Sequence, residues 1–311
     1  MHQLGILSCQ AGQYAALFQH AELSGIKLLF ANEQAASPQQ LAKVDILLAD
    51  PDLAVKALEH CHQLKWLQST WAGNKPLFDH PKRNYLLSGV KDVFQAAMVE
   101  YVFAYILYFS RNIDGFRQQQ LKAKWHAPGF TSLSKRRLGI IGVGNIGQGV
   151  ARAAKQFGMH VNGLSFHSRD CEAVDQYYQW DQAAEFCHGL DFLLCLLPHS
   201  QLTEGKIDQH FLALLPPECI LINAGRGQTI VEQDLLNCLQ NKRLKAAVLD
   251  VFEQEPLPAT HPFWQMDNVY ITQHTAAKSQ PSEIFTIFKH NAALFSQNQP
   301  LHGQLNFLRG Y

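Results

Sequence analysis

Three short blocks in the second half of the chain combine side chains that could bind an oxygenated anion and transfer a proton. They are Asn223-Ala-Gly-Arg-Gly227, Asp250-Val-Phe-Glu-Gln-Glu-Pro256 and Asn268-Val-Tyr-Ile-Thr-Gln-His274. Each lies at the end of a predicted strand, which is where the ligand-binding and catalytic residues of a parallel α/β sheet usually lie. Together they present one cation, several carboxylates and one histidine, the groups needed to orient a 2-oxo acid and to move one proton.

An earlier block, Gly142-Val-Gly-Asn-Ile-Gly147, has the G-x-G-x-x-G spacing of a dinucleotide-binding turn. It follows an apolar run and opens a helical pattern, so Gly142 would make the tight turn and Gly144 would let a pyrophosphate approach the backbone. Gly147 would allow the helix to pack closely on the strand. The alternative is a glycine-rich turn that binds no ligand. The cofactor contacts predicted at this turn are Gly142, Gly144, Asn145, Ile146 and Gly147.

The residues after the next predicted strand indicate which dinucleotide is bound. An NAD-binding protein usually places an acidic residue there, on the ribose 2′-hydroxyl, and a carboxylate would repel a 2′-phosphate. In this chain the position falls on Ser165, with His167, Ser168 and Arg169 just beyond it. A hydroxyl, an imidazole and a guanidinium could surround a phosphate, so we predict NADPH in preference to NADH. Two alternatives stay open: Asp170 reaches the ribose, or Arg169 is only a solvated surface charge.

Bringing these blocks together requires an α/β scaffold. Short aliphatic runs alternate with amphipathic, helix-like stretches along the chain, which predicts parallel sheets flanked by helices. The expected strands are 4–8, 27–31, 44–49, 64–68 and 85–87 in a first series, and 137–142, 160–166, 190–197, 219–223, 246–250 and 268–272 in a second. A helix over 93–113 separates the two series, and a helix over 282–296 is expected to return to the first. We therefore predict two domains, 1–97 plus 283–311 and 98–282.

Composition and charge exclude several classes of protein. The chain has 311 residues, of which 47% are apolar and 17% charged, so it can bury two globular cores and is neither disordered nor fibrous. Its 26 Lys and Arg balance 26 Asp and Glu, which argues against a nucleic acid or an anionic membrane as partner. The apolar runs are too short to span a bilayer, and the N-terminus lacks a secretion signal pattern. Seven scattered cysteines without a C-x-x-C pair indicate reduced thiols in a cytoplasmic protein, with no metal site.

In their order along the chain, the glycine turn and then the three blocks resemble the motifs of the D-isomer-specific 2-hydroxyacid dehydrogenase family. The resemblance runs from about Gln68 to the C-terminus. The ending Gly303-Gln-Leu-Asn-Phe-Leu-Arg-Gly-Tyr311 is similar to that of the bacterial glyoxylate/hydroxypyruvate reductase A group within the family. The resemblance implies a flavodoxin-like substrate domain, a Rossmann cofactor domain and a homodimer.

The resemblance also implies three catalytic residues. Arg226 would bind the carboxylate and carbonyl oxygen of the substrate, because a planar guanidinium can donate two parallel hydrogen bonds. His274 would be the general acid that protonates the carbonyl oxygen as hydride arrives at the adjacent carbon. Glu255 would bond the other ring nitrogen, which favours the imidazolium and fixes the ring. Gln273 departs from the family, which usually has proline before this histidine, and we expect only a kinetic adjustment.

Other positions follow from the same resemblance. Asp250 would contact the nicotinamide carboxamide, although an aspartate at a strand end often caps the following turn instead. Ala224 and Pro198 would line the cofactor site. A loop at 69–74 would receive the substrate carboxylate on its backbone amides, with Asn74 in place of the usual acidic residue. The substrate contacts predicted in this loop are Trp71, Ala72 and Gly73, and plain packing is the alternative for Trp71.

The implied activity is NADPH-dependent reduction of a small 2-oxo acid, glyoxylate or hydroxypyruvate, to the D-2-hydroxy acid. Two alternatives remain at this stage. One is a sibling activity of the D-lactate or phosphoglycerate type. The other is a non-catalytic, nucleotide-sensing regulator on the same fold, since fold alone does not fix function.

Overall fold

The computed structural model describes residues 1–21, 23–71, 73–90, 93–166 and 171–307. The chain divides into two compact units. Unit 1 comprises Met1–Val93 and Ser279–Tyr311, and unit 2 comprises Phe94–Lys278. The sequence placed the two boundaries slightly later, at 97/98 and 282/283.

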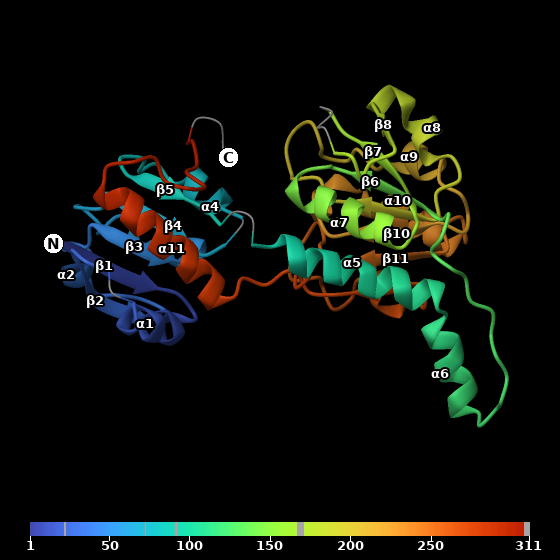
Figure 1. Ribbon diagram of the computed structural model, residues 1–311, viewed down its shortest axis with the longest axis horizontal. Coiled ribbons are helices and arrows are strands. Elements are labelled where there is room, and N and C mark those ends of the chain that lie inside the picture. Colours follow the sequence, from blue (N-terminus) through green and yellow to red (C-terminus); the bar gives the residue numbers. More distant parts are fainter. Residues whose placement is uncertain (22, 72, 91–92, 167–170, 308–311) are drawn as a thin grey trace. The chain divides into compact units, whose positions relative to one another are not determined.

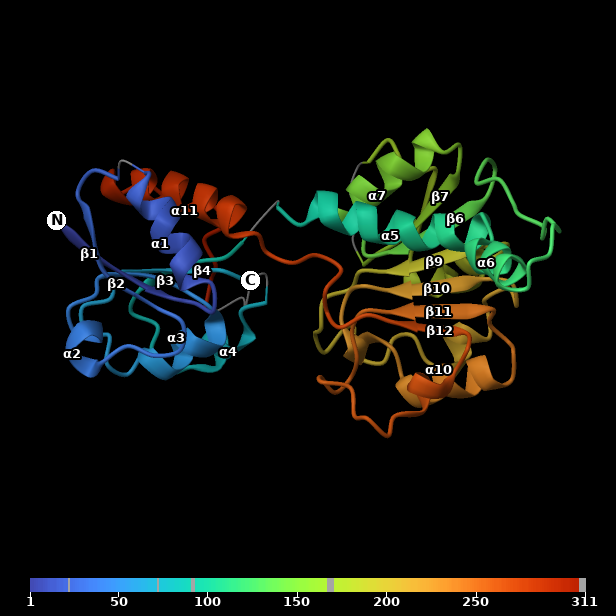
Figure 2. The same cartoon turned by 90° about the horizontal axis from the view of Figure 1, so that it is seen from below.

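Unit 1 is a parallel sheet between two layers of helices. Its strands are β1 His2–Leu7, β2 Ile26–Asn32, β3 Ile46–Ala49, β4 Trp66–Ser69 and β5 Leu86–Ser88, and its helices are α1 Ala11–Gln19, α2 Pro38–Leu41, α3 Pro51–Ala57, α4 Lys75–Asp79 and α11 Pro281–Ser296. The strand order is β2-β1-β3-β4-β5, which is the flavodoxin-like order. In Figure 2, α1 and α11 cover one face of the sheet, and α2, α3 and α4 cover the other.

Helix α11 comes from the end of the chain and completes one face of unit 1. The Trp66 ring of β4 stacks on Phe288 of α11, with ring centroids 5.1 Å apart. Both side chains are fully buried. A stacked aromatic pair adds to the free energy gained from burying its apolar area, so this contact anchors the returning helix.

Unit 2 is a larger parallel sheet with helices on both faces. Its strands are β6 Arg137–Ile141, β7 His160–Leu164, β8 Gln176–Tyr178, β9 Phe192–Cys195, β10 Ile220–Asn223, β11 Ala246–Leu249 and β12 Val269–Ile271, and its helices are α5 Gln95–Ser110, α6 Ile113–Leu121, α7 Asn145–Gln156, α8 Ala183–Cys187, α9 Gln209–Leu212 and α10 Glu232–Gln240. Figure 2 shows α5 and α7 on one face of this sheet and α10 on the other.

The strand order of unit 2 is β12-β11-β10-β9-β6-β7-β8. All neighbouring strands pair in parallel. The chain moves outward from β6 first to β7 and then, on the other side, to β9, so the order reverses at β6. Such a reversal is the switch point at which doubly wound sheets bind dinucleotides. The predicted fold class, two parallel sheets flanked by helices, is confirmed.

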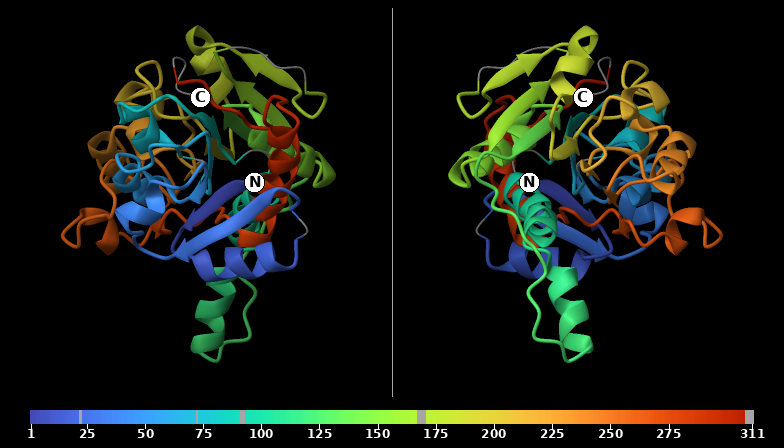
Figure 3. Two further views of the ribbon diagram at one scale, coloured as in Figure 1. Left: turned by 90° about the vertical axis from the view of Figure 1, so that its left-hand side faces the viewer. Right: turned by 90° about the vertical axis from the view of Figure 1, so that its right-hand side faces the viewer.

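The helix expected over 93–113 is α5, which ends slightly earlier, at Ser110. A further helix that the sequence did not predict, α6, follows after Asn112, whose backbone is left-handed with φ 51°. The Asn112 side chain accepts a hydrogen bond from the Gly115 N–H and thereby caps α6. Figures 1 and 3 show α6 projecting from the body of unit 2. No helix in the described part of the chain is long and apolar enough to cross a membrane.

Candidate active site

The predicted site residues of unit 2 that the structure describes follow the carboxyl ends of its strands. Gly142 follows β6, Ser165 follows β7, Asp250 follows β11 and His274 lies just after β12. Pro198 and Ala224 come after β9 and β10 in the same way. Because every strand is parallel to its neighbours, these positions share one edge of the sheet.

The glycine turn has the geometry of a phosphate site. Gly142 has φ 93°, a backbone conformation that residues other than glycine rarely adopt. A Cβ on Gly147 would lie 2.7 Å from the Gly142 carbonyl oxygen, so this position is closed by the fold itself. A Cβ on Gly144 would meet no atom of the described residues within 4 Å. The backbone at Gly144 is therefore open to a ligand.

Helix α7 begins within this turn, at Asn145. Its N-cap is Gly144, which has no side chain to cap the first helical N–H groups. A helix of twelve residues carries a positive partial charge at its N-terminus, which favours a phosphate group there. Asn145 and Ile146 occupy the first two helical positions, as the sequence predicted. The chain's own residues thus fit the pyrophosphate of a dinucleotide.

The positions that distinguish NADPH from NADH are described only in part. Ser165 directly follows β7, and its N–H donates to the Tyr178 carbonyl oxygen at 3.4 Å. His167, Ser168 and Arg169, together with the alternative Asp170, lie outside the described residues. Their predicted contact with a 2′-phosphate stays a prediction.

His274 and Glu255 form a hydrogen-bonded ion pair. His274 Nδ1 lies 2.8 Å from Glu255 Oε2, and the two side chains are 51% and 37% exposed. This bond raises the pKa of His274, against the lowering effect of burial and of Arg226. Burial alone would raise the pKa of Glu255, but its bonds to His274 and to the Phe252 N–H lower it. Nε2 of the imidazole is left as the atom that can meet a substrate.

Arg226 belongs to the same electrostatic cluster. Burial lowers the pKa of this guanidinium, and the nearby Glu255 carboxylate raises it. Nη1 donates to the Gly225 carbonyl oxygen at 2.7 Å. The Arg226 carbonyl accepts from Thr229 Oγ1 at 2.6 Å, which fixes the backbone from which the side chain extends. A half-buried cation held this way can bind a carboxylate, because fewer of its donors are hydrated.

Asp250 has a role that the sequence left as the alternative. Its side chain is buried, and its carboxylate accepts bonds from Thr272 Oγ1 at 2.5 Å, from the Thr275 N–H at 2.8 Å and from the Ala276 N–H at 3.1 Å. The carboxylate therefore holds the turn that carries His274. Its contact with a nicotinamide stays a prediction.

The remaining cofactor positions have ordinary surroundings. The Ala224 N–H donates to the Cys195 carbonyl oxygen at 3.2 Å, which extends the β9–β10 ladder past the end of the strands. Pro198 is exposed, and its carbonyl accepts from Thr203 Oγ1 at 2.6 Å.

The loop predicted to receive the substrate carboxylate lies after β4 in unit 1. Trp71 is 41% exposed, so its side chain is not core packing within that unit. Its N–H donates to Ser69 Oγ at 3.2 Å, and Thr70 Oγ1 donates to the buried carboxylate of Asp50. Ala72 lies outside the described residues, and the substrate contacts of Trp71, Ala72 and Gly73 stay predictions.

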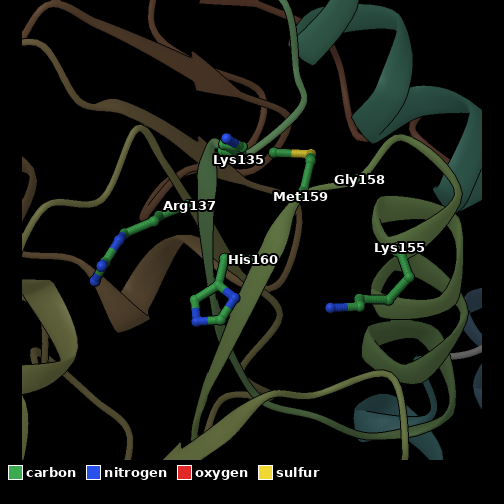
Figure 4. A pocket seen from close by; sticks show the side chains of 6 residues that line it. All are labelled: Lys135, Arg137, Lys155, Gly158, Met159 and His160. Carbon is green, nitrogen blue, oxygen red and sulfur yellow. The ribbon is translucent and has the colours of Figure 1, made fainter.

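A basic cavity of about 340 Å³ is separate from this site. Figure 4 shows Lys155 and His160 among its lining residues, where β6 and β7 begin, which is the opposite edge of the sheet. Lys155 donates to Asp175 at 2.8 Å and lies in the last turn of α7, where a cation balances the helix dipole. Its charge is thus explained by the fold.

Two residues outside every predicted motif contact the site. The Gln95 amide, on α5, donates to the Asn145 carbonyl oxygen at 2.6 Å. The Tyr101 hydroxyl, also on α5, lies 2.9 Å from Thr272 Oγ1. No local pattern marks either residue, since each contact joins segments far apart in the chain.

Comparison with known proteins places the chain in a family. Residues 103–276 match the family described as D-isomer specific 2-hydroxyacid dehydrogenase, NAD binding domain. A glyoxylate/hydroxypyruvate reductase A from Serratia proteamaculans is 35% identical over 214 residues, which cover 69% of this chain and 68% of that protein.

Solved structures agree with this assignment. A D-isomer specific 2-hydroxyacid dehydrogenase family protein from Aeromonas salmonicida is 37% identical, with a TM-score of 0.94 over 98% of this chain and 99% of that one. An NADPH-dependent glyoxylate/hydroxypyruvate reductase from Sinorhizobium meliloti, in complex with NADP and sulfate, is 28% identical, with a TM-score of 0.85 over the full length of both chains. The chain belongs to the D-isomer-specific 2-hydroxyacid dehydrogenase family and is an oxidoreductase with an NAD(P)-binding domain.

Proposed function

We propose that this protein reduces a small 2-oxo acid, glyoxylate or hydroxypyruvate, to the D-2-hydroxy acid with NADPH, and that His274 is the general acid. The observation that carries the proposal is the 2.8 Å bond between His274 Nδ1 and Glu255 Oε2 beside Arg226. A regulator that only senses nucleotides has no need of a proton-transfer pair.

Each catalytic residue would perform one step. Arg226 binds the substrate carboxylate and orients the carbonyl, which lowers the entropic part of the barrier. A reduced nicotinamide, when bound, supplies the hydride. His274 gives its Nε2 proton to the carbonyl oxygen, and general acid catalysis of this kind contributes roughly 10²–10⁴-fold. The bond to Glu255 raises the pKa of His274, so the acid form is available at neutral pH.

The preference for NADPH rests on Ser165 after β7, where a carboxylate would repel the 2′-phosphate. The Sinorhizobium relative is NADPH-dependent, which supports the same choice. Ser165→Asp should raise the KM for NADPH and lower the KM for NADH, because it restores a partner for the ribose hydroxyl. Steady-state kinetics with both cofactors measures this. An unchanged ratio of the two kcat/KM values in the variant would remove the argument.

The substrate class rests on relatives named glyoxylate/hydroxypyruvate reductase A. The test is loss of NADPH absorbance on a panel of glyoxylate, hydroxypyruvate, pyruvate and phosphohydroxypyruvate. We expect the first two to give the highest kcat/KM. Fastest turnover of one of the others would indicate a sibling activity, and cofactor binding without turnover on any of them would indicate a regulator.

We also propose a homodimer in the cytoplasm. Helix α6 projects from unit 2 and carries exposed apolar side chains. They are Ile113, Phe116 and Leu121, which are 51%, 42% and 64% exposed. Exposed apolar side chains on one element are typical of an interface. Light scattering should give twice the 35.0 kDa chain mass. Phe116→Glu should shift the protein toward the chain mass, and a monomeric wild-type protein would contradict the proposal. The cytoplasmic location is proposed from the seven scattered cysteines of the sequence, which form no C-x-x-C pair.

A further inference from the structure

A chain of hydroxyl groups runs from α5 to the turn that carries His274. The Tyr101 hydroxyl lies 2.9 Å from Thr272 Oγ1, and Thr272 Oγ1 lies 2.5 Å from Asp250 Oδ1. Tyr101 projects from α5, which lies across one face of the unit 2 sheet (Figure 2). Thr272 directly follows β12, two residues before His274.

The direction of these bonds follows from the number of protons. A hydroxyl group carries one proton, and Thr272 donates its proton to the Asp250 carboxylate. Thr272 Oγ1 must then accept from Tyr101, whose O–H is the donor. Burial and the nearby Asp250 carboxylate raise the pKa of Tyr101, so the phenol keeps its proton at neutral pH. Bonds aligned this way polarise and strengthen one another.

The chain ends on the backbone around His274. This residue has φ 54°, a left-handed conformation that costs about 1–3 kcal/mol and persists only when neighbouring contacts hold it. Three bonds do so here. The His274 N–H donates to the Asp250 carbonyl oxygen at 2.8 Å, and the Thr275 and Ala276 N–H groups donate to the Asp250 carboxylate.

We propose that Tyr101 is a positioning residue for His274, acting through Thr272 and Asp250 to hold the imidazole in its bond with Glu255. The inference rests on the proposed general-acid role of His274. Tyr101 touches neither Glu255 nor the imidazole in any contact found among the described residues. Its effect is therefore on the geometry of the turn.

The proposal predicts a change in the acid, as well as in the rate. The groups that set the charge of His274 are Glu255, Arg226 and Asp250. If the turn relaxes, the bond to Glu255 weakens, and the imidazole loses its proton at a lower pH. Reduction needs the protonated ring, so the alkaline fall of kcat should move to lower pH. A residue with only a structural role would lower stability without moving this profile.

The test compares Tyr101→Phe with Tyr105→Phe. Tyr105 lies one turn further along α5, with ring centroids 5.2 Å apart, and its hydroxyl makes no hydrogen bond among the described residues. Tyr101→Phe should lower kcat for glyoxylate by roughly three- to tenfold, the effect of one neutral hydrogen bond. The KM for NADPH should change less than about twofold, because the glycine turn is untouched. Tyr105→Phe should match the wild-type protein.

Two further measurements make the result decisive. Thr272→Val should reproduce the effect, Thr272→Ser should restore the wild-type values, and Tyr101→Phe should add little to Thr272→Val, because both act through one chain. NMR titration gives the pKa of the His274 imidazole without any catalytic turnover. The His274 signal is assigned as the one that is absent in His274→Gln. We expect a lower pKa in Tyr101→Phe and no change in Tyr105→Phe.

The outcomes separate the inference from the proposed function. If the wild-type protein reduces no 2-oxo acid, the proposed function is wrong. The NMR titration would still decide whether Tyr101 positions the imidazole ring. Normal turnover with Tyr101→Phe equal to Tyr105→Phe in kcat, pH profile and titration would overturn the inference alone.

Discussion

Gly144→Ala separates what the fold requires of the glycine turn from what the cofactor requires. Gly144 has φ −84° and ψ −159°, extended values that alanine adopts without strain. An added Cβ would meet no atom of the described residues within 4 Å. We therefore expect the free energy of unfolding to change by less than about 0.5 kcal/mol, as for ordinary surface substitutions.

Cofactor binding should change far more. A methyl group at Gly144 occupies the space through which a pyrophosphate would approach the backbone. Losing one hydrogen bond to a charged group costs about 1.5–3 kcal/mol. Since about 1.4 kcal/mol corresponds to a tenfold change in Kd, NADPH should bind roughly ten- to a hundredfold more weakly. Titration of NADPH fluorescence gives the Kd, and urea denaturation gives the stability.

Two matched alanine variants serve as controls. Gly12→Ala, on α1, also adds a Cβ with nothing within 4 Å, but it lies at no predicted phosphate site, so NADPH affinity should stay unchanged. Gly147→Ala would place its Cβ 2.7 Å from the Gly142 carbonyl oxygen and should lower stability. The reasoning is refuted if Gly144→Ala binds NADPH within about twofold of wild type, or if it loses as much stability as Gly147→Ala.

Three further substitutions test other parts of the site. His274→Gln should lower kcat by roughly 10²–10⁴-fold, with NADPH affinity and Tm unchanged, and a rate near wild type would exclude the general-acid role. Glu255→Gln removes the bond that raises the pKa of His274, so the alkaline fall of the reduction rate should move to lower pH; a shift to higher pH would contradict the pairing. Gly225→Ala would place a Cβ 2.7 Å from the Leu197 carbonyl oxygen, so urea denaturation should show a loss of about 1–3 kcal/mol, whereas unchanged stability would mean that this backbone yields easily.

The strands were predictable where both faces of the sheet are covered. β9 and β10 are short apolar runs, Phe-Leu-Leu-Cys and Ile-Leu-Ile-Asn, because a parallel strand between helix layers must be apolar on both sides. β8 was missed because it is a three-residue edge strand, Gln-Tyr-Tyr, that is only partly buried. Helix α6 was also missed. No residue of α6 is buried, so it lacks the apolar periodicity that marks a helix in the sequence, and a left-handed Asn112 separates it from α5.

The positions of the site residues followed from the sequence because each block ends a strand. Each motif shows which strand end carries a functional residue, and parallel pairing brings these strand ends to one edge of the sheet. The contacts of Tyr101 did not follow, because Tyr101 and Thr272 are 171 residues apart in the chain. A tyrosine on an apolar helix carries no sequence signal that distinguishes a packing ring from one whose hydroxyl has a partner.

Asp250 shows how one side chain can serve both the fold and the proposed chemistry. Oδ1 already accepts bonds from Thr272 Oγ1 and the Thr275 N–H, and the Ala276 N–H is shared between Oδ1 and Oδ2. A carboxylate offers about four lone-pair sites, so a nicotinamide carboxamide would find its remaining acceptor capacity mainly on Oδ2. Substituting Asp250 would remove this contact and release the His274 turn at once. Tyr101→Phe separates the two roles, because it weakens the hold on the turn and leaves the carboxylate in place.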